Sequence, residues 1–213
     1  MALSKFNFNS FDVTSVASTG LKFNSSANGF DTATAGVMTL ITTNTISSGV
    51  SSSSFTSGID STYDTYLIKW INCHPATADV NFTVNFRDGS SAFDATKTTI
   101  LFHAQHAESG SDASLSYRTG EDLAQSTDYQ YLGYQGNDND QVNCGEIFLF
   151  SPSSTTFVKH FIARVSNQHP SEYARNIFMS GYCNTTSAID GVDFKFSSGN
   201  IDSGVIKMYG VTK

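Results

Sequence analysis

Residues 80–87 have the sequence Val-Asn-Phe-Thr-Val-Asn-Phe-Arg, and this stretch decides the fold class. Apolar and polar residues alternate along it without interruption, which predicts a β-strand with two valines and two phenylalanines on one face. Val84 then points into a core, whereas its neighbour Thr83 faces solvent. A strand with one apolar and one polar face is typical of an antiparallel sheet that covers a core on one side.

The same period of two recurs along most of the chain after residue 60. Residues 192–196 alternate in this way, and a cluster of Ser, Gly, Asn and Asp separates them from the apolar run 205–209. We expect these two strands to form a hairpin at the end of the chain. Further strands are expected at residues 66–73, 98–104, 146–150, 157–165 and 178–183.

Helical periodicity is nearly absent, and the best candidate, residues 120–125, is too short for more than one or two turns. Short strands that are joined by Gly, Asn and Ser turns favour sheet-on-sheet architectures. The sequence therefore predicts an all-β protein, an antiparallel β-sandwich of jelly-roll type.

The composition is dominated by hydroxyl side chains, with 31 Ser and 23 Thr among 213 residues and only 15% charged residues. Such a composition excludes a coiled coil or a helical bundle rich in Ala, Lys and Glu. The 13% aromatic content excludes a disordered chain, because disorder accompanies aromatic poverty. With a net charge of −7, the chain lacks the excess of Lys and Arg that binds phosphate backbones, so we expect no nucleic-acid partner.

The first part of the chain carries very little charge: residues 1–59 contain two Lys and two Asp. A run of Ser and Gly over residues 47–54 resembles a flexible linker, but a strand-like pattern resumes directly after it. The run is therefore either a boundary or a polar strand within one continuous sheet. We predict a β-sandwich domain over residues 55–213, preceded by an N-terminal arm or extra strands over residues 1–54.

Cys73, Cys144 and Cys183 are widely spaced and include no Cys-x-x-Cys pair. They predict buried, reduced thiols instead of a zinc site or a disulfide framework. The N-terminus lacks the features of a secretory signal, and no stretch approaches the roughly 18 apolar residues of a membrane span. We therefore expect a protein that is made in a cytoplasm and has no membrane partner.

Two clusters resemble metal sites, but neither has the required pattern. His103 and His106 would share a face only on a helix, and on the expected strand they point in opposite directions, so they cannot bind one ion together with Glu108. Residues 137–140, Asn-Asp-Asn-Asp, resemble the start of a calcium loop that lacks the required glycine. Nucleophile-elbow, phosphate-loop and dinucleotide motifs are also missing from the sequence. We expect no enzyme activity, no metal and no cofactor.

Tyr129, Tyr131 and Tyr134 are the candidate ligand-binding residues. They lie within residues 128–134, Asp-Tyr-Gln-Tyr-Leu-Gly-Tyr. Exposed aromatic rings beside carboxylate and amide groups can stack on the faces of sugars. Strand alternation also explains Tyr129 and Tyr131 as one packed face without a ligand, so both interpretations stay open.

Five longer stretches carry a family resemblance: FTSGIDSTYDTY at 55–66, INCHPAT at 71–77, LFSPSSTTFVKH at 149–160, GYCNTTSAID at 181–190 and FSSGNIDSGVIKMYG at 196–210. As a set they resemble virion structural proteins of marine tailed bacteriophages, notably cyanophages. The resemblance extends over about residues 55–210 and implies no catalytic residues. It implies a protein that is located in the virion after synthesis in the host cytoplasm.

Our first hypothesis is a capsid decoration or cement protein, a homotrimer or other homo-oligomer that binds the phage major capsid protein and stabilises neighbouring subunits. The compact size, the absence of heptad repeats and the candidate arm over residues 1–54 favour it. The alternative is a tail or tail-fibre component that contacts other tail proteins and binds carbohydrate receptors. Either role suits a surface of hydroxyl and amide groups, whose contacts depend less on ionic strength than ion pairs do.

Overall fold

The computed structural model describes residues 19–23, 30–34 and 38–211. Its contacts divide the chain into two compact units, residues 1–39 and residues 40–213. In the first unit, β1 (Thr19–Phe23) and β2 (Phe30–Thr34) form a two-stranded antiparallel sheet. The second unit contains the two larger sheets.

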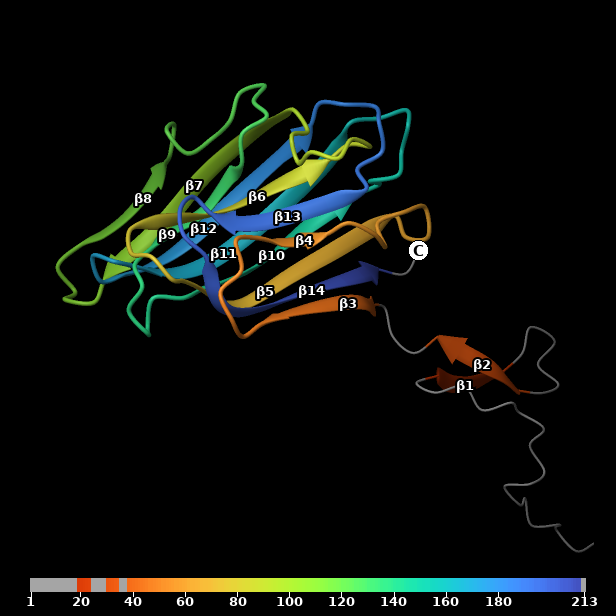
Figure 1. The fold of residues 1–213 in the computed structure, drawn as a ribbon, viewed down its shortest axis with the longest axis horizontal. Helices are drawn as coiled ribbons and strands as arrows, with labels where there is room; N and C mark the ends of the chain where they lie inside the picture. Colours follow the sequence, from red (N-terminus) through yellow and green to blue (C-terminus); the bar gives the residue numbers. More distant parts are fainter. Residues whose placement is uncertain (1–18, 24–29, 35–37, 212–213) are drawn as a thin grey trace, which may run out of the picture. The chain divides into compact units, whose positions relative to one another are not determined.

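These two antiparallel sheets form two layers (Figure 1). The larger has eight strands in the order β3-β14-β5-β10-β11-β12-β7-β8, and the smaller has four in the order β4-β13-β6-β9. The strands of the larger sheet are β3 (Met38–Ile46), β5 (Thr65–Pro75), β7 (Lys97–Ala107), β8 (Ala113–Tyr117), β10 (Asn143–Phe150), β11 (Lys159–His169), β12 (Tyr173–Cys183) and β14 (Ile201–Val211). Those of the smaller sheet are β4 (Ser53–Phe55), β6 (Val80–Arg87), β9 (Gln130–Gln135) and β13 (Gly191–Phe196). The described residues form no helix, and hence none that could span a membrane.

The prediction of an all-β antiparallel sandwich is confirmed. Burial alternates along β11, where Phe161, Ala163 and Val165 are buried while Ile162 and Arg164 between them are exposed. Such alternation places one side of each sheet against the other and leaves the second side accessible. The more specific jelly-roll topology stays a prediction.

The predicted terminal hairpin is wrong. β13 pairs with β4 and β6 in the smaller sheet, whereas β14 pairs with β5 in the larger one. The Ser-Gly-Asn cluster at residues 197–200 therefore carries the chain from one sheet to the other. The hairpin was expected because a turn-forming cluster separates two successive strands. Such a local pattern does not identify the strand with which each one pairs.

The expected solvent-facing position of Thr83 is also wrong. Val84 is fully buried as predicted, but Thr83 is only 7% exposed. Its hydroxyl donates to the Lys195 carbonyl oxygen at 2.8 Å, and its side chain lines a pocket under residues 120–123. Residues 120–123 thus cover the outer side of β6. The alternation within residues 80–87 does not predict this contact, because the covering loop comes from another part of the sequence.

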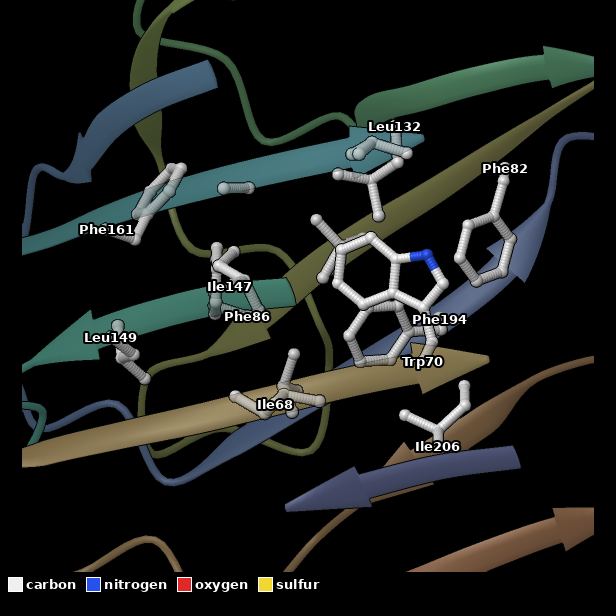
Figure 2. Packing of buried hydrophobic residues seen from close by; sticks show 14 of the residues in the cluster. Ile68, Trp70, Phe82, Phe86, Leu132, Ile147, Leu149, Phe161, Phe194 and Ile206 are labelled. Carbon is white, nitrogen blue, oxygen red and sulfur yellow. The ribbon is translucent and has the colours of Figure 1, made fainter. Parts of the chain in front are cut away.

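The core lies between the sheets and is built around aromatic rings (Figure 2). Trp70 of β5 packs against Phe82 and Phe194 of the smaller sheet, with ring centroids 6.1 and 5.6 Å apart. Gly145 leaves room for the indole, because a side chain there would collide with it. The buried indole Nε1–H donates to Asn143 Oδ1 at 2.6 Å, so this polar group of the core is paired.

The division into compact units falls between Thr39 and Leu40, inside the predicted segment 1–54. β3 joins the larger sheet beside β14, and β4 joins the smaller sheet beside β13. The latter part of that segment thus supplies strands to the sandwich. Residues 1–18, and with them the start of the candidate arm, lie outside the described residues.

Candidate functional site

A pocket of about 430 Å³ lies where both sheets meet the connection between β8 and β9. β11 contributes His169 and β12 contributes Arg175, while the connection contributes Arg118 and Glu121. All three predicted tyrosines line it, and we call it the tyrosine pocket. Its full lining is Asn81, Thr83, Arg118, Gly120, Glu121, Asp122, Leu123, Asp128, Tyr129, Tyr131, Tyr134, His169 and Arg175.

The pairing of β6 with β9 brings two of the tyrosines to one side of the smaller sheet. Tyr131 lies opposite Thr83 and Tyr134 opposite Asn81, with a β-bulge where the register shifts after Phe82. Residues three apart on a regular strand point to opposite faces. The bulge removes this restriction, so that Tyr131 and Tyr134 both lie on the side of Thr83 and Asn81.

The connection that closes the pocket is fastened to β7 and β9. Leu123 and Thr99 are joined twice, because Leu123 N–H donates to Thr99 Oγ1 and Thr99 N–H donates to the Leu123 carbonyl, both at 2.8 Å. Gln130 Nε2 donates to the carbonyl oxygen of Glu121 at 3.0 Å. These bonds hold Glu121 beside the pocket. The short helix considered for residues 120–125 is therefore a loop with a defined path.

Three buried polar atoms of the pocket make no hydrogen bond of normal length and angle: the Tyr131 hydroxyl, Arg175 Nε and Glu121 Oε2. The Tyr131 hydroxyl nevertheless lies close enough to Arg175 for that side chain to lower its pKa, against the larger effect of burial. Tyr131 is 7% exposed and Arg175 is 9% exposed. Each charged side chain is also held by one hydrogen bond, since Arg175 Nη2 donates to Gln105 at 2.8 Å and Glu121 Oε1 accepts from Arg118 at 2.7 Å. An unpaired buried polar group costs about 1–3 kcal/mol, so three of them around one cavity indicate a site for a hydrogen-bonding ligand.

Burial keeps two ring side chains of the pocket uncharged at neutral pH. Burial, followed by the charge of Glu121, raises the pKa of Tyr131 to about 12. Burial, followed by the charge of Arg175, lowers the pKa of His169 to about 4. In agreement with a neutral imidazole, Ser171 N–H donates to His169 Nδ1 at 3.1 Å.

The other two tyrosines make structural contacts as well as lining the pocket. The Tyr129 hydroxyl donates to Asp193 at 2.8 Å, and Lys195 Nζ lies 3.9 Å from the Tyr129 ring centroid. The ring of Tyr134 packs against His169 with centroids 5.2 Å apart. The structure therefore brings the predicted residues together, and Tyr131 is the one of the three whose hydroxyl is buried without a partner.

Arg175, His169 and Glu121 were not predicted from the sequence as residues of a site. The sequence pattern around Arg175 could have identified it. Arg175 precedes Ile177 and Met179 at a spacing of two, and so occupies an inward position of β12. A charged residue at an inward position of an apolar alternation is uncommon and points to a site. Glu121 carried no such signal, since only the folded path of the connection places it near β12.

The side of the larger sheet that faces away from the core carries a second candidate surface. Ile100 and Ile162 are each 52% exposed, and Phe102 is 39% exposed. Cross-strand pairing places Ser180 between the two isoleucines and Phe148 beyond Ile162. These side chains form a continuous surface across four strands. We call it the outer apolar face, made of Ile100, Phe102, Phe148, Ile162 and Phe178.

Charged groups beside the outer apolar face are engaged within the sheet. The Phe102 and Phe178 rings stack with centroids 5.2 Å apart, and the Arg164 guanidinium lies 5.3 Å from the Phe178 centroid. Farther along the same row, Lys69 Nζ lies 3.4 Å from Glu146 Oε2. The charged groups of this row are therefore in contact with neighbours within the sheet. The apolar side chains of the outer apolar face remain accessible to solvent.

The cysteines and histidines that were considered as metal ligands are dispersed. All three cysteines are free, as predicted; Cys73 and Cys183 are buried, but Cys144 is partly exposed. On β7, His103 is buried and His106 is exposed, so the two side chains point in opposite directions as expected. Within residues 19–23, 30–34 and 38–211, no group of three or more His, Cys, Asp or Glu side chains could hold a metal ion.

We compared the chain with family models, with curated proteins and with solved structures, and none of these comparisons found a match. The tyrosine pocket and the outer apolar face are therefore the structural features from which a function can be proposed.

Proposed function

We propose that the protein is a non-catalytic structural component of a tailed-phage virion, specifically a capsid decoration protein. The outer apolar face is the observation that carries this proposal. Contiguous exposed apolar side chains on one surface are typical of sites that contact other proteins. The resemblance of residues 55–210 to phage virion proteins supports the same role, with the major capsid protein and further copies of the chain as partners.

The chemistry of the outer apolar face suits a particle that persists in seawater. Its central row contains Ile100, Ser180, Ile162 and Phe148, none of which is charged. High ionic strength screens exposed ion pairs, which contribute little even in dilute buffer. Burial of apolar area does not depend on charge and is strengthened by many salts, so a contact made through this face would persist in seawater.

Replacement of both isoleucines tests the proposal. We expect Ile100→Asp with Ile162→Asp to lower binding to purified capsids that lack the protein by at least about tenfold, corresponding to ~1.4 kcal/mol. Both side chains are half exposed, so the fold should persist, as measured by circular dichroism. Ser166→Asp is the matched control, because Ser166 is exposed on the same side of β11. Unchanged capsid binding by the folded double variant would refute the proposed docking surface.

A tail or tail-fibre component that binds carbohydrate is the second candidate, and the tyrosine pocket is the observation that favours it. Copy number in purified virions separates the two candidates. A number comparable with that of the major capsid protein would support decoration of the head. A number comparable with that of known tail proteins of the same particle would support the second candidate, and absence from the particle would exclude both.

A further inference from the structure

We infer that the tyrosine pocket binds one uncharged sugar ring, and that hydroxyl groups of the sugar pair with Tyr131, Arg175 and Glu121. This inference rests on the second candidate function and names the ligand class and the residues that would bind it. The three side chains come from β9, β12 and the β8–β9 connection, so the pocket exists only in the folded protein.

The unpaired atoms require a ligand that both donates and accepts. Arg175 Nε–H needs an acceptor, Glu121 Oε2 needs a donor, and the Tyr131 hydroxyl can take either role. A sugar hydroxyl both donates and accepts, so neighbouring hydroxyls of one ring can satisfy all three atoms. A carboxylate group has acceptor oxygens only and would leave Glu121 Oε2 unpaired. Inorganic phosphate keeps one or two hydroxyl donors near neutral pH, but its negative charge would face the Glu121 carboxylate.

The charges around the pocket also disfavour an anion. Arg118 and Arg175 are accompanied by three carboxylates, those of Glu121, Asp122 and Asp128. Arg118 is already paired with Glu121, with 2.7 Å between Nη2 and Oε1. An anionic ligand would therefore meet little net attraction and would approach carboxylates that repel it.

The size and the lining of the pocket fit a sugar ring. Its volume of about 430 Å³ lies in the range of about 300–1,000 Å³ that is usual for small-molecule sites. The rings of Tyr129, Tyr134 and His169 line it beside the polar atoms. Aromatic rings bury the apolar C–H face of a sugar while nearby polar groups pair with its hydroxyls.

Ligand-observed and protein-observed NMR on the full chain test the inference. D-glucose, D-galactose and D-mannose are the uncharged probes, and D-glucuronate and inorganic phosphate are the anionic controls. We expect at least one uncharged sugar to bind with saturable shifts of amide signals in residues 120–123 and 130–135. Tyr131→Phe removes only the unpaired hydroxyl, and it should weaken this binding by about tenfold without lowering Tm.

The control substitution is Tyr182→Phe, which removes a hydroxyl outside the tyrosine pocket and should leave sugar binding unchanged. Three results would overturn the inference: no shifts with any uncharged sugar, binding of the anions alone, or equal sugar binding by Tyr131→Phe. These results do not depend on where the protein lies in the particle. Copy number in the virion can therefore exclude a tail location while sugar binding stands, and the reverse is equally measurable.

Discussion

Trp70 and Tyr131 are both buried aromatic residues with one polar atom, and they differ in the hydrogen bonding of that atom. The Trp70 indole N–H is paired with Asn143 in the centre of the core, as is usual for buried donors. The Tyr131 hydroxyl is also buried, but it makes no hydrogen bond of normal length and angle. An unpaired buried hydroxyl lowers stability, and such a cost is expected at sites that bind a ligand. The unpaired hydroxyl of Tyr131 thus distinguishes the tyrosine pocket from the core around Trp70.

His169 makes folding stability depend on pH. Its pKa is lowered to about 4, first by burial and then by the charge of Arg175, with a further contribution from His103. In the unfolded chain a histidine titrates near its ordinary value of about 6.5. Between these two values only the unfolded state binds the proton, so acidification favours unfolding. The stability contribution is complete above about pH 6.5 and is lost as the pH falls towards 4.

We therefore expect the free energy of unfolding in urea to fall between pH 7 and pH 5, with at most about a tenfold change in the unfolding equilibrium per pH unit from this group. His169→Gln should flatten that dependence. His106→Gln, on the exposed side of β7, controls for the loss of a histidine as such. The assignment would be contradicted if His169→Gln kept the slope of the wild-type protein.

At the scale of single elements, period-two alternation predicted most of the strands after residue 60, although not β8, and it did not always predict which face is buried. On β6 and β13 the apolar residues point inwards, as expected. On β7 the arrangement is reversed in part, because Ile100 and Phe102 point outwards while Lys97, Thr99 and His103 are buried. Lys97 Nζ is satisfied by the carbonyl oxygen of Asp128 at 2.7 Å, a contact that depends on the folded path of residues 118–129.

The candidate site was predictable only where its residues are close in sequence. Tyr129, Tyr131 and Tyr134 belong to one short stretch, and that stretch does line the pocket. Arg175 and Glu121 are brought to it by the β12–β7 pairing and by the loop after β8, which are long-range features. A local pattern reports on side-chain direction, whereas the meeting of separate elements depends on sheet topology.

The strand register can be tested with one pair of substitutions. Val84 is fully buried in the smaller sheet, and Val84→Asp would place an unpaired charge in the core. We expect a loss of about 4 kcal/mol or more, seen as insoluble expression or a greatly lowered urea midpoint. Ser166→Asp on the exposed side of β11 should be within about 0.5 kcal/mol of the wild-type value. Equal tolerance of both changes would refute the register.

At the scale of the whole molecule, every strand of the two larger sheets lies within residues 38–211. Both larger sheets are formed by strands β3 to β14, and the buried hydrophobic cluster extends from Ile46 to Met208. β1 and β2 pair only with each other among the described strands. A shortened protein can therefore test whether the first unit contributes to stability, and whether it contributes to the proposed binding to capsids.

A chain that begins at Met38 should fold with a Tm within a few degrees of the full protein, because it retains every strand of both larger sheets. Since the proposed docking surface is the outer apolar face, the shortened chain should also bind capsids, whereas the Ile100→Asp, Ile162→Asp variant should not. Calorimetry and co-sedimentation with capsids measure the two properties. An unchanged Tm together with complete loss of capsid binding would move the attachment function from the outer apolar face to the N-terminal arm.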